Sequence, residues 1–454
     1  MSEQNSKSRG IALMPFLVFI VVYLGTGIIL SLKGVEMAFY QLPLPIAVLC
    51  GVVVAFITTK EPMNKRFTIF MNGCGNEDIL TMCCIYLFAG GFAVVAKAMG
   101  GVDATANLGL SIIPAQYMTA GIFVISAFLG ISTGTSMGTI GAIGPIAIAT
   151  ADKAGLNLAL VLGAVVGGAI FGDNLSVISD TTIAATRTQG VEMRDKFRVN
   201  FLIALPAAIV TFVLLLIFGK PETVVALDSL DYNFIKVIPY ITVLVLALAG
   251  LNVFITLGIG TILAGIVGLS YGSFDIIGFA ANTYTGYTGM IEIFIGSLWM
   301  GGLSAMVTHN GGINWMLNKI QGFIKTKRSA EIGIAALSSV ADCATANNTV
   351  AIIVSGPIAK NICENYKVDP RKSASLLDIW SCVFQGIMPY AAQVILACSL
   401  SGGRVSPIGL VPYSWYEMAL AVFAAISMFV PYAEGVLRKR PWDFEKWDVA
   451  EGTK

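Results

Sequence analysis

The chain has 454 residues, of which 56% are hydrophobic and 12% charged, with a net charge of +1 and a mean hydropathy of +0.79. A soluble domain carries about 25% charged residues, so this composition excludes an ordinary soluble protein, and the near-neutral charge gives no field that would attract nucleic acid. Apolar runs of about 20 residues recur along the chain, the length at which a helix crosses a bilayer. We therefore predict an all-α polytopic membrane protein.

The first apolar run, Ile11–Leu30, follows Lys7 and Arg9. It is too long for the core of a signal peptide and lacks an A-x-A cleavage pattern, so we expect a retained first span. The eight cysteines of the chain lie mostly inside apolar runs and form no CxxC pair. This pattern favours small buried side chains over disulfides or metal ligands.

The two halves of the chain resemble each other. STGTSMGTIGAIGPIA (132–147) and ATANNTVAIIVSGPIA (344–359) align without a gap at an offset of 212 (344 − 132), with six of sixteen positions identical. The same offset places the spans around 43–58 and 200–218 opposite those around 255–270 and 412–430. We predict two repeats, residues 1–218 and 236–432, joined by an external linker at 219–235 and followed by a cytoplasmic tail at 433–454.

Positive charge in the short loops indicates that the repeats are inverted, because Lys and Arg gather on the cytoplasmic side. Each basic loop in one repeat aligns with a charge-poor loop in the other. The basic loops are 59–78, 187–199, 317–330 and 360–374, and their charge-poor counterparts are 271–289, 399–411, 99–111 and 151–157. We expect a multi-pass protein of the inner (cytoplasmic) membrane with both chain ends in the cytoplasm.

Inverted-topology repeats are typical of secondary transporters, whose sites lie near the midplane on discontinuous helices. The stretches 130–145 and 341–357 combine helix breakers with polar side chains in apolar surroundings. Backbone leaves a helix at this depth only where it is buried or lines a cavity. We therefore predict broken or re-entrant helices at both stretches.

The stretch FGDNLSVISDTTIAATRTQG, residues 171–190, is unusually polar. A carboxylate at the bilayer centre costs at least about 2.5–3.5 kcal/mol, which a bound cation or proton would offset. The alternative for both aspartates is that the segment is a cytoplasmic helix end with capping Ser and Asp, which the basic residues nearby favour for Asp180. The two aspartates are seven residues apart, so a continuous helix would put both on one face. The candidates for cation or proton binding here are Asp173, Asn174, Ser176, Asp180 and Thr181.

The predicted breaks carry hydroxyl and amide oxygens. Such oxygens suit a hard cation such as sodium, and helix N-termini beside them suit a substrate carboxylate. Hydrogen bonding between helices is the alternative. The candidates at these tips are Thr133, Thr135, Ser136, Thr345, Asn347 and Asn348.

Three further residues are weaker candidates. Asp342 lies beside the second tip, and Gln385 aligns with Asp173 at the same offset. His309 is the single histidine, a side chain that titrates near neutral pH but is more often interfacial than functional. Motifs for nucleotide binding, zinc proteases and nucleophilic hydrolases are missing from the sequence, so we expect neither an enzyme nor an ATP-driven pump.

The segment FGDNLSVISDTT matches the pattern G-D-x-x-S-x-x-S-D-T-T and resembles the NhaC-type sodium/proton antiporter family, within the broader ion-transporter superfamily. The match is carried by Gly172, Asp173, Ser176, Ser179, Asp180, Thr181 and Thr182. The resemblance implies sodium coupling, a sodium ion near Asp173, and cation and proton handling by Asp173 and Asp180. It also implies re-entrant helices with polar tips.

Two functions stay open at this point. The first is sodium/proton antiport by alternating access, with Na⁺ and H⁺ as coupling ions and no cofactor. The second is sodium-coupled uptake of an amino acid or another organic solute, held at the polar tips. The expected partners are membrane lipid, sodium, protons and, under the second function, an amino acid. A homodimer is left open.

Overall fold

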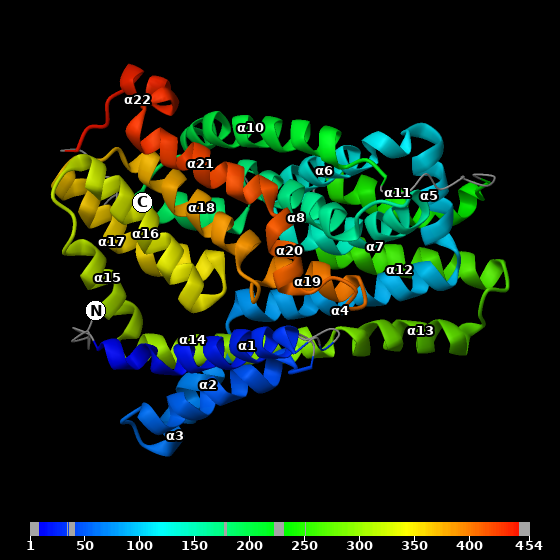
Figure 1. The fold of residues 1–454 in the computed structure, drawn as a ribbon, viewed down its shortest axis with the longest axis horizontal. Coiled ribbons are helices and arrows are strands. Elements are labelled where there is room, and N and C mark those ends of the chain that lie inside the picture. Colours follow the sequence, from blue (N-terminus) through cyan, green and yellow to red (C-terminus); the bar gives the residue numbers. More distant parts are fainter. Residues whose placement is uncertain are drawn as a thin grey trace.

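The computed structural model describes residues 9–33, 35, 41–176, 179–221, 231–249 and 251–444. Within these ranges every regular element is a helix (Figure 1). Eight of the described helices are long and apolar enough to cross a membrane, or nine if the bent pair Pro407–Tyr413 and Trp415–Phe429 is one span. The all-α polytopic fold predicted from composition is confirmed.

The described helices fall into two sets that follow one another along the chain. The first set is α1 (Met14–Leu32), α2 (Leu44–Thr58), α3 (Met63–Cys74), α4 (Glu77–Ala98), α5 (Gly101–Ile112), α6 (Ala115–Thr133), α7 (Ser136–Ala154), α8 (Leu158–Leu175), α9 (Asp180–Gln189) and α10 (Met193–Phe218), preceded by the short η1 (Gly10–Leu13). The second set is α11 (Phe234–Leu248), α12 (Val253–Ser270), α13 (Ile276–Gly289), α14 (Ile291–His309), α15 (Gly312–Gln321), α16 (Lys327–Thr345), α17 (Asn348–Tyr366), α18 (Pro370–Ile387), α19 (Ala392–Leu400), α20 (Pro407–Leu410), η3 (Val411–Tyr413), α21 (Trp415–Phe429), η4 (Tyr432–Glu434) and α22 (Gly435–Lys439).

The helix boundaries repeat at the offset found in the sequence. Helices α6, α7 and α8 begin and end at positions that this offset carries onto the ends of α16, α17 and α18. The interruptions repeat as well: α8 and α9 are separated by residues 176–179, and α18 and α19 by residues 388–391. The similarity of two short segments therefore extends to the architecture of both halves.

Each repeat contains a helical hairpin, and the two hairpins extend inward from opposite ends of the molecule. Helices α6 and α7 form a hairpin on the right of Figure 1, and α16 and α17 form the matching hairpin on the left. Their tips, at residues 134–135 and 346–347, meet at one pocket in the interior. Equivalent hairpins that meet tip to tip from opposite ends have inverted topology, as predicted from the loop charges.

Each hairpin turns through one residue in the left-handed region. Gly134 has φ +65° and Ala346 has φ +51°, a conformation that is easy for glycine and strained for alanine. The next residue then caps the second arm, because the side chains of Thr135 and Asn347 accept hydrogen bonds from Gly138 N and Val350 N. The Gly/Thr-rich and Ala/Asn-rich tips therefore break the helix for the same local reason.

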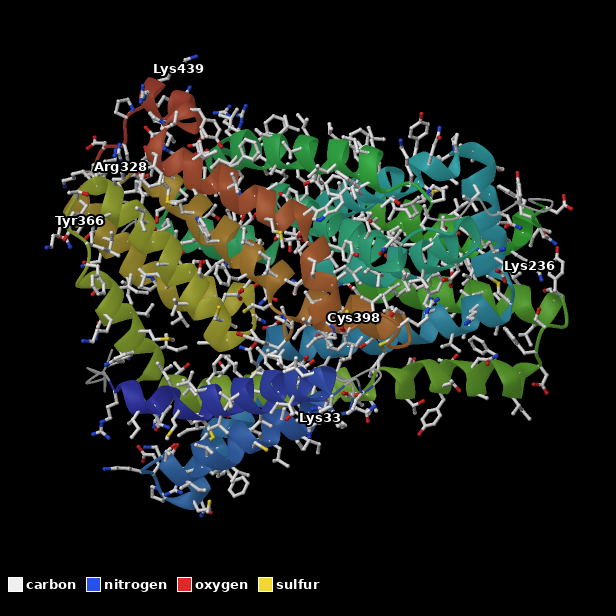
Figure 2. All side chains as sticks on the ribbon, viewed as in Figure 1. Lys33, Lys236, Arg328, Tyr366, Cys398 and Lys439 are labelled. Atoms are coloured by element: carbon white, nitrogen blue, oxygen red, sulfur yellow. The ribbon has the colours of Figure 1, made fainter. Side chains whose placement is uncertain are left out.

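Charged side chains mark the two ends of the molecule (Figure 2). Arg328 and Lys439 lie at the end that also carries η1 and α22, and Lys236 lies at the opposite end. Counting Lys196, Arg371 and Lys372 among the loop charges was wrong, because these side chains belong to α10 and α18 and are only 1%, 3% and 3% exposed. The contrast with the aligned segments of the other repeat rests on the basic residues that are not buried: Arg187, Arg194, Arg198, Lys360 and Lys367.

Candidate functional site

A polar pocket lies where the two hairpin tips meet the interruption between α8 and α9. Its volume is about 540 Å³, with its open mouth included. Both repeats contribute to its wall. The lining residues are Thr81, Ile85, Gly134, Thr135, Ser136, Met137, Asp173, Ser179, Asp180, Thr181, Asn347, Asn348, Thr349, Gln385 and Gln393.

The polar stretch 171–190 is a broken helix. Helix α8 ends at Leu175 and α9 begins at Asp180, so the expectation that one helix face carries both aspartates is wrong. Asp173 stands in the last turn of α8 and is buried, whereas Asp180 is the exposed first residue of α9. The break turns both residues toward the same pocket.

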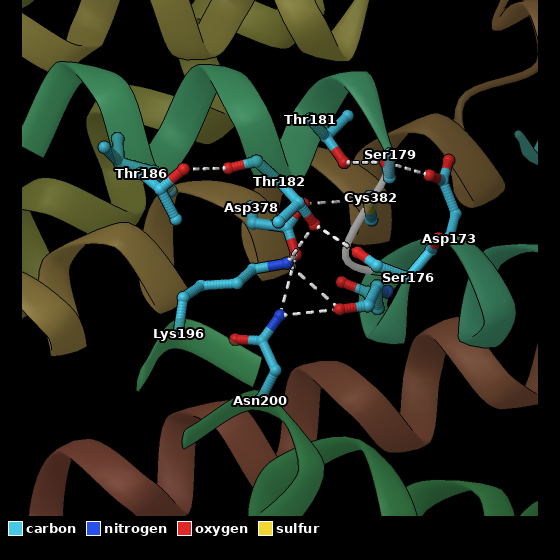
Figure 3. A network of polar contacts seen from close by, with 12 residues as sticks. Asp173, Ser176, Ser179, Thr181, Thr182, Thr186, Lys196, Asn200, Asp378 and Cys382 are labelled. Atoms are coloured by element: carbon cyan, nitrogen blue, oxygen red, sulfur yellow. Dashed lines mark hydrogen bonds and ion pairs between the residues drawn. The ribbon is translucent and has the colours of Figure 1, made fainter. Parts of the chain in front are cut away.

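The Asp173 carboxylate is held by hydroxyl groups. Ser136 Oγ donates to Asp173 Oδ2 at 2.9 Å, and Ser179 Oγ donates to Oδ1. Gln393 Nε2 in turn donates to Ser136 Oγ at 3.2 Å, and Thr181 Oγ1 lies 2.8 Å from Ser179 Oγ (Figure 3). Among the described residues no Lys, Arg or His forms an ion pair with Asp173. The negative charge is therefore solvated by hydroxyls but not neutralised.

Close packing of α6 on α8 brings the carboxylate to the first hairpin tip. A Cβ on Gly130 would lie 2.8 Å from Ala169 O and 3.0 Å from Gly172 Cα. Substituting Gly172 would likewise bring a Cβ within 2.5 Å of the Gly130 backbone. Glycine is thus required for the approach of the two backbones. This contact places Asp173 beside Ser136.

The structure separates the six tip residues into two groups. Thr133 Oγ1 and Thr345 Oγ1 lie 3.4 and 3.0 Å from the carbonyls of Thr135 and Asn347 and bind the turn itself. These bonds connect the two helices of each hairpin, which is the structural role given above as the alternative to binding. The remaining four, Thr135, Ser136, Asn347 and Asn348, line the pocket. Their role in binding stays a prediction.

Removing the cap of α17 should destabilise the second hairpin. Asn347→Ala deletes the acceptor for Val350 N, which lies 2.9 Å from Asn347 Oδ1, and loss of an N-cap costs about 0.5–2 kcal/mol. We expect a lower thermal unfolding temperature in detergent. Asn347→Ser, which keeps a capping oxygen, is the matched control and should retain most of the stability. Equal unfolding temperatures for the Ala and Ser variants would contradict the capping role.

Of five other predicted residues, only Gln385 lines the pocket. Gln385 lines it and donates to Asp342 Oδ1 at 2.8 Å. Asp342 itself is fully buried behind this amide, and its Oδ2 has no partner among the described residues. Asn174 and Ser176 do not line the pocket, and their backbone carbonyls accept hydrogen bonds from Lys196 Nζ and Thr182 Oγ1. The fifth, the single histidine at 309, is not part of the wall.

Sequence reasoning missed a buried ion pair beside the break (Figure 3). Lys196 Nζ lies 2.7 Å from Asp378 Oδ2, and the two side chains are 1% and 0% exposed. Lys196 also donates to Thr182 Oγ1 at 2.7 Å and to Asn174 O at 3.0 Å. Asn200 Nδ2 donates to Asp378 Oδ2 and to Asn174 O. The ammonium group thus satisfies the carbonyl end of α8, where a positive charge also complements the helix dipole.

Of the residues that the sequence analysis did not predict, Gln393 has a signal in the repeat alignment and Asp378 has none. Gln393 aligns with Thr181 at the repeat offset, so the self-comparison points to it as a counterpart of a predicted site residue. Asp378 aligns with Val166 and has no such signal. Its partner, Lys196, lies in the segment 187–199, which the sequence predicts to be a basic loop. Only the packing of α10 against α18 brings these two charges together.

Comparison with known proteins places the chain among transporters. The sequence model described as the Na⁺/H⁺ antiporter family matches residues 5–220 and 301–433. The chain is 24% identical to a malate-2H⁺/Na⁺-lactate antiporter of Bacillus subtilis (strain 168), over 92% of this chain and 94% of that protein. It is 28% identical to the Na⁺/H⁺ antiporter NhaC of Alkalihalophilus pseudofirmus, over 48% of this chain and 50% of that protein. Among solved structures, it is similar to the YdaH transporter of Alcanivorax borkumensis, with a TM-score of 0.45 and 12% identity over 88% of this chain and 98% of that one.

Proposed function

Because the chain belongs to the Na⁺/H⁺ antiporter family, we propose that it exchanges sodium ions for protons at Asp173 by alternating access. The observation that carries this assignment is the state of the Asp173 carboxylate. It is buried, it lines a polar pocket, and within the described residues only hydroxyl groups bind it. A buried carboxylate in this condition requires either a cation or a proton.

The donor set suits sodium. Carboxylate, hydroxyl and amide oxygens are the ligands that hard cations prefer. Gln393 lines the pocket, and its buried Oε1 has no hydrogen-bond partner in the described part of the chain. That oxygen is therefore free to face an ion.

Exchange follows from competition for one carboxylate. Sodium and a proton each neutralise Asp173, so binding of one displaces the other. The pocket lies between inverted hairpins, so a movement of one repeat against the other would open it to alternate sides. Each opening lets the carboxylate exchange its cation with a different compartment. The coupling ions are then Na⁺ and H⁺, and no cofactor is required.

Reconstitution tests this function directly. Purified protein in proteoliposomes should move protons when a sodium gradient is imposed, as reported by a pH-sensitive dye inside the vesicles. A potassium gradient of the same size is the control and should move few protons. Vesicles that hold folded protein yet show no sodium-dependent proton movement would contradict the proposal.

A second function, sodium-coupled transport of an organic anion or amino acid, is supported by the remaining polar wall. Asn347, Asn348 and Gln385 present amides to the pocket, beside the N-terminus of α17, and such a terminus attracts carboxylates. The B. subtilis relative is named for malate and lactate. A thermal-shift screen of amino acids and hydroxy acids, with and without sodium, separates the two functions. A true substrate at about 100 times its Kd would add about 2.7 kcal/mol of stability.

The cellular placement belongs to the same proposal. We place the protein in the cell inner membrane, surrounded by lipid, with both chain ends in the cytoplasm. The common location of η1 and α22 at one end of the molecule supports this orientation, as do the basic loops. A homodimer and an amino-acid partner stay predictions.

His309 is positioned to influence pH dependence from outside the pocket. Its Nε2 lies 3.3 Å from Glu61 Oε1, where the end of α14 meets the α2–α3 connection. A protonated ring would form an ion pair with Glu61 that a neutral ring cannot. His309→Gln should flatten the rate profile between about pH 6 and 8. The prediction is checked by measuring transport rates across this pH range for His309→Gln and for the paired variant Glu61→Gln. If both variants keep the wild-type pH profile, the His309–Glu61 pair does not control pH dependence.

A further inference from the structure

A carboxyl group that has no hydrogen-bond partner among the described residues lies deep in the protein, outside the pocket. Glu417 stands in the first turn of α21 and is 0% exposed. Neither Oε1 nor Oε2 has a hydrogen-bond partner among the described residues. The exchange at Asp173 does not use this residue.

Glu417 is inserted between the broken helices of the two repeats. Its Oε1 lies 2.7 Å from the position that a Cβ on Gly386 of α18 would occupy, and 3.7 Å from the corresponding position at Gly167 of α8. Gly386 follows Gln385, which lines the pocket. In addition, Ser414 Oγ, just before α21, donates to Gly386 O at 2.8 Å. The carboxyl group therefore sits directly behind the pocket wall, in space left by two glycines.

Within the described part of the chain, no charged group forms an ion pair or a hydrogen bond with Glu417. The titratable groups on the helices packed against α21 include Asp173 of α8, Lys196 of α10, and Asp378 and Cys382 of α18. On α16 they include Glu331 and Asp342. Within the described residues none of these is bonded to Glu417. An isolated buried carboxylate is so unfavourable that the neutral acid is the stable form. In this conformation Glu417 therefore holds a proton.

We infer that Glu417 is a second proton-exchanging group of the transport cycle, an inference that rests on the proposed sodium/proton exchange. Asp173 and Glu417 would each take up one proton on one side and release it to water on the other. Alternating access moves the broken helices that enclose Glu417, so its surroundings differ between the two open states. Release leaves a carboxylate, which water entering behind Gln385 would solvate, and rebinding restores the acid.

The number of protons exchanged per sodium ion tests the inference. Glu417→Gln keeps the shape of the neutral acid but cannot release a proton. We expect the variant to retain exchange while moving one proton fewer per sodium ion than the wild type, as measured from parallel proton and radioactive-sodium fluxes. Because the variant moves one positive charge fewer per sodium ion, its transport rate should respond differently to an imposed membrane potential. Glu192→Gln, at an exposed position, is the control. A ratio and potential dependence identical to the wild type would overturn the inference.

A second measurement tests Glu417 even if Glu417→Gln does not fold or the wild-type protein shows no exchange. Lipophilic carbodiimides modify protonated carboxyl groups in apolar sites, and mass spectrometry can locate the adducts on the wild-type protein. Modification of Glu417 that falls as the pH rises supports proton release. No modification, or the same extent at every pH, contradicts it. Loss of sodium-driven proton movement in the wild type contradicts only the proposed function.

Discussion

Replacing Asp173 by asparagine should abolish sodium-driven proton movement in proteoliposomes while leaving the protein folded. An asparagine side chain has the same shape and can still bond to Ser136 and Ser179, which hold the carboxylate. However, the asparagine amide has no negative charge, so it cannot bind sodium and a proton in turn as the carboxylate does. Each 1.4 kcal/mol of lost binding lowers affinity about tenfold, so losing a buried carboxylate ligand should weaken sodium binding by about two orders of magnitude or more.

Stability measurements separate this effect from misfolding. Sodium should raise the unfolding temperature of the wild type, because a ligand that binds only the folded state stabilises it by mass action. It should not raise that of Asp173→Asn. In sodium-free buffer the variant should be at least as stable as the wild type, since the neutral amide replaces a buried carboxylate that would otherwise have to bind a proton. Asp152→Asn, whose partner Arg404 lies in an exposed pair, is the matched control. Wild-type exchange in Asp173→Asn would exclude Asp173 as the exchanging group.

Replacing Lys196 by methionine should destabilise the protein by about 3–5 kcal/mol, the usual effect of breaking a buried ion pair. The substitution leaves Asp378 charged and buried, with only Asn200 Nδ2 still donating to its Oδ2. It also removes the donor to Asn174 O at the end of α8. The break that presents Asp173 to the pocket would lose its support. We therefore expect sodium-dependent stabilisation to decline with the unfolding temperature.

A double-mutant cycle identifies the pair as the cause. Lys196→Met combined with Asp378→Leu removes both charges and should recover part of the stability, because an apolar pair often replaces a buried ion pair without loss. The control is Lys65→Met, which removes the exposed partner of Glu61 and should change stability by about 0–1 kcal/mol. Thermal unfolding in detergent reports all variants. A Lys196→Met protein that unfolds at the wild-type temperature would show that the pair contributes little.

The two interruptions in the first repeat illustrate what local sequence can reveal. The hairpin tip at Thr133–Ser136 contains glycine and a capping threonine, so local chemistry alone ends one helix and starts the next. The interruption at 176–179 has the sequence SVIS, with neither glycine nor proline. It persists because Lys196 and Thr182 bind the carbonyls of Asn174 and Ser176. That second break could not be predicted, since its partners come from other elements.

The membrane class, the repeat offset, the inverted topology and the candidate site at Asp173 were all predictable from the amino-acid sequence. These follow from composition, self-similarity, loop charge and an unusual local motif, all of which can be read along the chain. Tertiary structure alone decided that Lys196 is a buried partner of Asp378 and that Asp173 and Asp180 lie on separate helices. It also showed Glu417 buried with no hydrogen-bond partner among the described residues. The physical reason is that burial and pairing depend on helices distant in sequence: Lys196 belongs to α10 in the first repeat and Asp378 to α18 in the second, and no local pattern records that contact.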